Sequence, residues 1–177
     1  VSVRHFDSIL NFLVEGEHNV CFMGGSCSRY FMVEHNGDVY PCDFFARSDL
    51  RLGNVTTDSF RRMAESPIYR KFGAAKNRWS PACGDCEFLP LCSGDCLKNR
   101  PGQDREPATL SHLCEGWKLF YRETLPVFRE LARDILRRRG TGDTEPHPRT
   151  VKTGAECYCG SGRRYENCHG HRPAAEE

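Results

Sequence analysis

Long apolar runs are absent from this sequence. Its hydrophobic stretches are only a few residues long, whereas a membrane-spanning helix needs about 20 apolar residues in succession, and no segment resembles a secretory signal peptide. We therefore expect a cytoplasmic protein that has no membrane partner. In such a reducing compartment, cysteines bind metal ions more often than they form disulfides.

Net charge is also nearly absent. The chain has 25 Lys and Arg residues against 24 Asp and Glu, a formal net charge of +1 at pH 7. Without a broad positive field, neither nucleic acid nor an anionic membrane is indicated as a partner. Hydrophobic residues make up only 38% of the 177 residues, so we expect a core too small to hold the fold without metal centres or other cross-links.

The abundant residue is cysteine, of which there are 11. An odd number cannot be paired completely in disulfides, which again favours metal binding. Eight of these thiols precede residue 115, twice the four that one 4Fe-4S cluster or one structural zinc ion requires. They are Cys21, Cys27, Cys42, Cys83, Cys86, Cys92, Cys96 and Cys114.

The densest group of cysteines is the stretch CGDCEFLPLCSGDC, residues 83–96. Its C-x2-C-x5-C-x3-C spacing is interleaved with Pro and Gly, so we predict an irregular loop rather than a regular helix or strand. Such a loop can turn backbone N–H groups toward cluster sulfurs, but C-x2-C followed by another close cysteine pair is also typical of zinc ribbons. The stretch alone leaves iron-sulfur and zinc equally open, and the four further cysteines favour two centres.

A β-hairpin is predicted over residues 28–41. Two β-prone runs flank Asn36-Gly37, the preferred pair for a type I′ turn, in which both residues have positive φ. Pairing of the two runs would bring Cys42 back toward the strand that follows Cys27, so that both thiols could share one centre. The alternative is a plain hairpin with two unrelated buried cysteines.

Asp43 directly follows Cys42. Successive side chains on an extended segment point to opposite faces. If Cys42 faces a metal centre, Asp43 is therefore expected to point away from it, toward solvent or a neighbouring pocket. Taken alone, an Asp at this position is interpreted as solvated.

The N-terminal residues carry no recognisable chemistry. Residues 1–6 are predicted to form a short strand, followed by a helix over FDSILNFLVEG that Asp7 or Ser8 would cap and Gly16 would end. Because the chain opens on Val1 rather than Met, in the middle of this strand-like run, we interpret it as a fragment of a longer protein.

The segment 52–76 is predicted to start as a loop and to continue as a helix from about Thr57, with Thr57 or Asp58 at its N-cap. Pro67 would open a further turn or helix. The Lys and Arg residues of this segment are expected to form a solvated face.

Residues 110–139 are predicted to form a long amphipathic helix, with Ser111 as N-cap and a kink or break at Pro126. Cys114 would lie in its first turn, within reach of the preceding loop. Apolar side chains recur along it at steps of three and four residues. They are Leu113, Trp117, Phe120, Tyr121, Phe128, Leu131 and Ile135.

The C-terminal tail has the residues of a zinc site. Residues 140–156 are rich in Gly, Pro and Thr and are predicted to be a flexible linker. The following CYCGSGRRYENCH offers three thiols and an imidazole, a tetrahedral zinc set, and so short a piece cannot bury a core without metal. The predicted ligands are Cys157, Cys159, Cys168 and His169, with His171 as a less favoured substitute for the imidazole.

The order and spacing of the eight cysteines closely resembles a SPASM domain, the twin auxiliary-cluster region of many radical S-adenosylmethionine enzymes. The opening VSVRHFD, the YPCDF at 40–44 and the LGNV at 52–55 are most similar to the anaerobic sulfatase-maturating enzymes. The resemblance covers residues 1–125. The tail separately resembles the SEC-C motif, a small zinc module found at the end of the preprotein translocase ATPase and elsewhere.

The resemblance implies two sets of cluster ligands. The first auxiliary 4Fe-4S cluster would be held by Cys21, Cys27, Cys42 and Cys96. The second would be held by Cys83, Cys86, Cys92 and Cys114.

The resemblance also implies a chemistry, the oxidation of a sulfatase's active-site Cys or Ser to formylglycine. A 5′-deoxyadenosyl radical takes a hydrogen from Cβ, a base deprotonates the side chain, and an electron leaves to an auxiliary cluster. Asp43 matches the family's proposed base, which must lie within hydrogen-bond reach of the substrate. The implied partners are a sulfatase-derived peptide or unfolded sulfatase and an electron-transfer protein.

One family feature is missing. The C-x3-C-x2-C motif of the radical cluster is absent, because Cys92-x3-Cys96 is followed by Asn99 where a third Cys is needed, and no barrel precedes the domain. S-adenosylmethionine is therefore expected to bind only with a missing N-terminal barrel, and this chain alone is expected to be inactive.

The predicted fold class is a small, irregular α+β fold, with a short hairpin and helices organised around two iron-sulfur clusters and a separate zinc knuckle. The predicted units are the end of a preceding barrel or its connector (1–20), the twin-cluster domain (21–125), the rest of the C-terminal helix (126–139), a linker (140–156) and the zinc motif (157–171).

Two alternatives remain open. The chain could be a SPASM peptide-docking module of another peptide-modifying radical enzyme, or a stand-alone zinc-binding interaction protein. Under any of these hypotheses the zinc tail would dock an unknown protein. Arg163, Arg164 and Tyr165 could contact an acidic partner there, or form a solvated loop.

Overall fold

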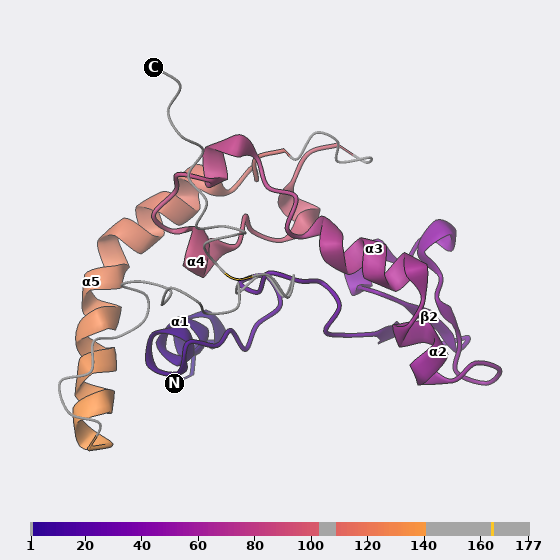
Figure 1. The fold of residues 1–177 in the computed structure, drawn as a ribbon, viewed down its shortest axis with the longest axis horizontal. Coiled ribbons are helices and arrows are strands. Elements are labelled where there is room, and N and C mark those ends of the chain that lie inside the picture. The colour runs from indigo at the N-terminus through magenta and orange to yellow at the C-terminus, as the bar shows by residue number, and fades with distance from the viewer. Residues whose placement is uncertain (1, 103–108, 141–163, 165–177) are drawn as a thin grey trace.

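The computed structural model describes residues 2–102, 109–140 and Arg164, and combines helices with a small antiparallel sheet (Figure 1). This confirms the predicted mixture of helix and hairpin. The helices are α1 (Arg4–Glu15), α2 (Phe60–Ala64), α3 (Pro67–Ala75), α4 (Leu89–Cys92) and α5 (Cys114–Arg138), with 3-10 turns at Asp43–Phe45, Ser48–Leu50, Pro81–Cys83 and Leu97–Asn99; the strands are β1 (Met32–Val33), β2 (Asp38–Tyr40) and β3 (Gly53–Asn54).

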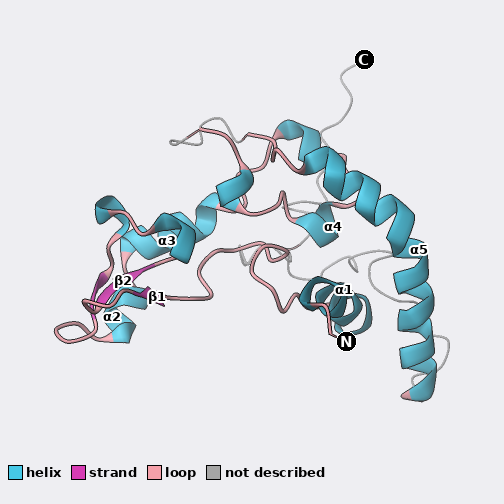
Figure 2. Ribbon diagram, turned by 180° about the vertical axis from the view of Figure 1, so that it is seen from behind, coloured by secondary structure: helices cyan, strands magenta, loops and turns pink. Residues whose placement is uncertain are grey.

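The molecule has two ends joined by the cysteine loop. Figure 1 shows α1 beside α5 at one end, and the sheet with α2 and α3 at the other. Viewed from behind, α4 and the loops around it lie between these ends (Figure 2). The loop 83–96 is irregular as predicted except for α4, a single helical turn that the prediction of no helix missed.

The N-terminal helix starts earlier than predicted. Residues 4–6, expected in a strand, form the first turn of α1, because this places His5, Ile9 and Phe12 on one face against α5. No side chain caps the helix, so the prediction of Asp7 or Ser8 at its start is wrong. The prediction that Gly16 ends it is confirmed, with φ of 76° at that glycine.

The hairpin is confirmed, but its turn is of another type. Met32 pairs with Tyr40 and Val33 with Val39. The amide of Gly37 donates to the carbonyl of Glu34 at 2.8 Å, and Gly37 has positive φ while Asn36 does not. The loop is therefore longer than a two-residue type I′ turn.

A third strand, β3, completes the sheet and was expected as loop. Its residues pair with the far side of β2, Asn54 with Asp38 and Gly53 with Val39. The Asn54 amide Nδ2 donates to the carbonyl of Asn36 and to Asp38 Oδ1, both at 3.0 Å. The strand thus holds the hairpin turn in place.

Serines cap the two helices that follow. Ser59 accepts from the backbone of Arg62 at the start of α2, and Ser66 accepts from that of Ile68 at the start of α3. The predicted caps Thr57 and Asp58 are wrong. The prediction that Pro67 opens a helix is confirmed.

The long C-terminal helix is confirmed as α5, which continues through Pro126 and bends along its length (Figures 1 and 2). Leu113 and Leu131, expected on its apolar face, are 47% and 44% exposed. Leu113 occupies the N-cap position instead of Ser111. The core between α5, α1 and the cysteine loop consists of Ile9, Phe12, Leu13, Val20, Met23, Phe88, Leu91, Tyr121, Leu125, Phe128 and Ala132.

No helix in residues 2–102 or 109–140 combines the length and apolar composition that crossing a bilayer requires. The predicted linker 140–156, apart from Gly140, lies outside the described residues. The predicted zinc ligands Cys157, Cys159, Cys168 and His169 also lie outside them, together with His171, Arg163 and Tyr165. Arg164 is described and exposed.

Candidate metal-cluster sites

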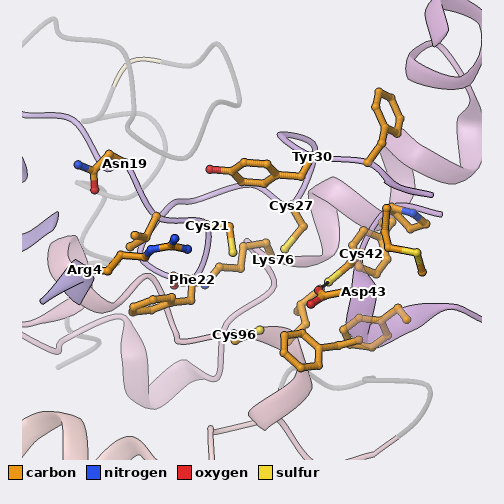
Figure 3. A pocket seen from close by; sticks show the side chains of 18 of the residues that line it. Arg4, Asn19, Cys21, Phe22, Cys27, Tyr30, Cys42, Asp43, Lys76 and Cys96 are labelled. Atoms are coloured by element: carbon orange, nitrogen blue, oxygen red, sulfur yellow. Dashed lines mark hydrogen bonds between the residues drawn. The ribbon is translucent and has the colours of Figure 1, made fainter. Parts of the chain in front are cut away.

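Four thiols from separate segments of the chain meet at one cavity of about 760 Å³. Two come from the loop between α1 and β1, one follows β2, and one follows the left-handed turn after α4. Figure 3 shows the four sulfurs around the same space, with the Lys76 side chain among them. These thiols are Cys21, Cys27, Cys42 and Cys96.

The other four thiols line a second, much smaller cavity of about 30 Å³. The first residue of α5 supplies one of them, and the loop around α4 supplies the other three. Trp117 and Phe88 close this cavity with apolar surface. Its thiols are Cys83, Cys86, Cys92 and Cys114.

The thiols of each set share a cavity without converging on one point. All eight are free cysteines, and within residues 2–102 and 109–140 no three Cys, His, Asp or Glu side chains are placed to ligate a single metal ion. A structural zinc ion draws four ligands to about 2.3 Å from one centre, whereas each cysteine of a four-iron cluster binds a different iron. Four thiols around each cavity are the number that either one structural zinc ion or one four-iron cluster requires.

Burial keeps three of these thiols, Cys27, Cys42 and Cys92, protonated in the absence of a metal centre. It raises the pKa of Cys27 to about 11, and that of Cys42 and Cys92 to about 12. For Cys42, the nearby Asp43 carboxylate acts in the same direction. Because only thiolates ligate metal, cluster binding here must displace protons.

Asp43 lies on the first cavity together with Cys42, and the prediction that it points away is wrong. Cys42 is extended, with φ of −164°, but Asp43 begins a 3-10 turn that rotates its carboxylate back to the same side. The Cys42 thiol donates to Asp43 Oδ1 at 3.3 Å. The two groups lie side by side in Figure 3.

Lys76 was expected on a solvated face, yet it is fully buried on the wall of the first cavity. Its Nζ donates to the carbonyls of Phe22 at 3.0 Å, Ser93 at 2.8 Å and Asp95 at 2.5 Å. Three acceptors match the three N–H bonds of an ammonium. Burial, and next the charge of Arg100, lowers the pKa of Lys76 to about 8, so the group is charged at neutral pH.

Arg100 is the second buried cation that sequence reasoning missed. It is 5% exposed and lies beside Lys76, whose carbonyl accepts from Arg100 Nη2 at 3.0 Å. Nothing in the sequence distinguishes these two residues from surface residues, because their burial depends on where distant carbonyls point. The only signal is their position, one on each side of the cysteine loop.

Aromatic side chains form the rim of the first cavity. Tyr30 and Phe44 are 54% and 55% exposed, and Lys98 Nζ lies 3.6 Å from the centre of the Phe44 ring. On the side of α1, the rim is polar: it includes Arg4, which Figure 3 labels, and Asp7. The cavity is therefore open to a ligand larger than a cluster.

Comparison with known protein families gives two matches along the chain. Residues 13–87 match the SPASM family, described as an iron-sulfur cluster-binding domain. Residues 155–170 match the SEC-C motif. The first match includes five of the eight thiols discussed above, and the second includes all four predicted zinc ligands.

Curated relatives agree with the first match. The cysteine-type anaerobic sulfatase-maturating enzyme of Clostridium perfringens is 30% identical over 135 residues, 76% of this chain and 36% of the relative. The serine-type enzyme of Bacteroides thetaiotaomicron is 32% identical over 137 residues, 76% of this chain and 33% of the relative. The chain thus spans about a third of the length of these relatives.

A solved structure has the same fold over the same share of the chain. The structure of "native anSMEcpe with bound AdoMet and Kp18Cys peptide" superposes with a TM-score of 0.71 at 30% identity, covering 76% of this chain and 37% of that one. A second structure of the same protein contains the Cp18Cys peptide and also gives a TM-score of 0.71.

Proposed function

Because the chain carries a SPASM iron-sulfur cluster-binding domain related to the anaerobic sulfatase-maturating enzymes, together with a SEC-C motif, we propose that it is the auxiliary-cluster part of a sulfatase maturase. In this role it would accept an electron, supply a base and help to bind the substrate peptide. S-adenosylmethionine would bind to another part of the complete enzyme.

The observation that supports this most is the division of the thiols between two cavities. The set of Cys21, Cys27, Cys42 and Cys96 lines one, and the set of Cys83, Cys86, Cys92 and Cys114 lines the other. We propose these as the ligands of two 4Fe-4S clusters. Each cluster, when bound, supplies a one-electron acceptor.

Asp43 is the proposed base. Ligation of Cys42 would remove the thiol proton that now donates to Asp43 Oδ1, and the carboxylate would become free to accept a proton from a substrate side chain in the cavity. The oxidation would then balance: the substrate Cβ would give one hydrogen atom to the radical that S-adenosylmethionine supplies in the other part of the enzyme, Asp43 would accept one proton, and the clusters, when bound, would supply the acceptor for one electron.

The substrate is proposed to be a segment of a sulfatase that presents its Cys or Ser to the first cavity. The related structures contain bound peptides, and here the open cavity and its aromatic rim would receive one. An electron-transfer protein would reoxidise the clusters. We expect the protein to act in the cytoplasm.

For the tail we propose one zinc ion held by Cys157, Cys159, Cys168 and His169. The match to the SEC-C motif includes all four, and three thiols with one imidazole are a set that zinc prefers. We propose that this module docks a protein partner.

The deciding experiment measures iron, acid-labile sulfide and zinc in the chain prepared without oxygen. We expect about eight iron, eight sulfide and one zinc per chain. About three zinc ions without sulfide would mean that every cysteine set is structural, and would overturn the redox role.

A further inference from the structure

The turn that connects the two cavities has an unusual backbone. Ser93, Gly94 and Asp95 have φ values of 46°, 68° and 63°, so three successive residues adopt the left-handed region, which is unfavourable for Ser and Asp. The turn joins Cys92, on the second cavity, to Cys96, on the first. Its conformation therefore sets how one thiol of each set is placed.

Two buried cations hold this turn. Lys76 Nζ donates to the carbonyls of Ser93 at 2.8 Å and Asp95 at 2.5 Å. Arg100 donates through Nε to the carbonyl of Gly94 at 2.9 Å, and through Nη2 to the same Ser93 and Asp95 carbonyls at 3.2 Å. Every carbonyl of the left-handed turn thus accepts from at least one cation.

The same cations tie the turn to the rest of the first cavity. Lys76 Nζ also donates to the carbonyl of Phe22, next to Cys21, at 3.0 Å. Arg100 Nη1 donates to the carbonyl of Arg78 at 3.0 Å, ahead of the cysteine loop. The two side chains therefore join the turn to the segment that carries Cys21 and to the segment that leads to Cys83.

Within residues 2–102 and 109–140, neither cation forms an ion pair with a carboxylate, although the charge of the Asp95 carboxylate acts on Arg100. Among the described ion pairs none includes Lys76 or Arg100. The nearby Asp95 carboxylate accepts instead from Ser111 Oγ at 2.6 Å and Asn99 Nδ2 at 2.9 Å. Buried charges are stable only when they are compensated. Besides the Asp95 carboxylate, the cysteines around each cavity would supply negative charge once they ligate a cluster as thiolates.

We propose that Lys76 and Arg100 are positioning residues for the two iron-sulfur centres: they fix the turn that places Cys92 and Cys96, and their buried charge raises the reduction potential of both centres. This inference rests on the proposed function. Lys76 lines the first cavity, so its charge acts more strongly on the first centre than on the second. Positive charge favours the reduced, more negative state of a cluster.

The test uses the full chain, reconstituted with iron and sulfide without oxygen. Lys76→Gln removes the charge but keeps two N–H donors, and Lys76→Arg keeps the charge. We expect Lys76→Gln to shift both midpoint potentials to more negative values, the first more than the second, in redox titrations followed by electron paramagnetic resonance. Lys76→Arg should restore them.

The matched control is Lys71→Gln. Lys71 lies in α3, the helix whose C-cap is Lys76, but is exposed, so its loss should leave both potentials and the iron content unchanged. An equal shift in the control would mean that any change of net charge produces the effect, and would overturn the proposal.

Loss of assembly is also informative. One outcome is that Lys76→Gln and Arg100→Gln bind no iron. Recovery of iron binding in the charge-conserving variants Lys76→Arg and Arg100→Lys would then support the proposal, whereas loss of iron binding in all four variants would overturn it. A fully loaded Lys76→Gln chain with unchanged potentials overturns this inference alone. A wild-type chain that binds no iron and sulfide overturns the proposed function as well.

Discussion

At the scale of single residues, the most consequential contact is the one between the Cys42 thiol and the Asp43 carboxylate. It places a proton acceptor 3.3 Å from a proposed cluster ligand. A group in that position can take a proton while the neighbouring centre takes an electron. The proton and the electron that the oxidation removes from the substrate would then go to adjacent acceptors.

This arrangement predicts that Asp43→Asn, made in a full-length maturase that contains this domain, lowers formylglycine formation by about 100-fold or more. The amide has nearly the same shape but accepts no proton. Mass spectrometry of a substrate peptide measures the product, and iron analysis should show intact clusters. Asp49→Asn is the control, since Asp49 is 60% exposed and pairs with Arg47 on the surface. Wild-type turnover by Asp43→Asn would favour the peptide-docking alternative.

His18 predicts a pH dependence. Its ring stacks on Phe12 at 4.0 Å, and its Nε2 lies 2.8 Å from the carbonyl of Pro90. Burial lowers the pKa of His18 to about 4, from 6.5 in the unfolded chain. Between these values the unfolded chain binds a proton that the folded chain does not. The free energy of unfolding therefore decreases as the pH falls from 6.5 to 4, by about 3 kcal/mol.

Urea denaturation of wild type and His18→Gln at several pH values checks this expectation. The difference between the two proteins should change with pH in that window, while His35→Gln, at a side chain that is 94% exposed, should follow wild type. Parallel curves for all three proteins would show that another group controls acid stability.

At the scale of elements, the packing of α3 against the loop before β1 controls the first thiol set. The backbone amide of Cys27 donates to the carbonyl of Gly73 in α3. A Cβ at Gly73 would overlap Ser28 Oγ and lie 2.8 Å from Ser28 Cβ. Only glycine allows the loop to approach the helix this closely.

We therefore expect Gly73→Ala to destabilise the protein by roughly 1–3 kcal/mol and to reduce iron binding by the first set. Gly116→Ala is the matched control, because nothing lies within 4 Å of a Cβ added at Gly116 in α5. Because alanine has a higher helix propensity than glycine, the Gly116→Ala variant should be more stable than wild type by about 0.5–1 kcal/mol. Thermal unfolding with iron analysis measures both. Equal stability of the two variants would contradict the close packing at Gly73.

At the scale of the whole molecule, the two ends differ in how they are held together. The end with α1 and α5 has an extended apolar core. Around the first cavity, the buried apolar cluster consists of Phe45, Phe72 and Leu97, with Cys27 and Cys42 packed against it. With so small a core, the proposed cluster would be the main source of stability there.

Removal of iron is expected to affect the ends unequally. Amide hydrogen exchange should accelerate strongly in the loops that carry the first thiol set and in the sheet, while α1 and the part of α5 packed on it stay protected. Comparison of the loaded and chelated protein by mass spectrometry measures this, with α5 as the internal reference. Uniform acceleration along the chain would show that the molecule unfolds as one unit.

The sequence predicted much of this arrangement, and the features that it did not predict were missed for physical reasons. Cysteine spacing predicted that eight thiols act together, and the structure places four of them on each of two cavities; their role as ligands stays a prediction. β3 was missed because a strand of two residues has no period. Lys76 and Arg100 could not be found, because their burial follows from the carbonyls of a left-handed turn that only the folded chain contains.

The turn between Cys92 and Cys96 also has a consequence for protein exposed to air. Only three residues separate a thiol of the open cavity from a thiol of the closed one. If oxygen entered the open cavity and destroyed the proposed centre there, Cys96 would no longer be held by a metal. The turn of residues 93–95 would then be free to move, and Cys92 would be less firmly placed in the other centre. Damage should therefore spread from one cavity to the next, and a half-loaded protein should not accumulate during oxidation.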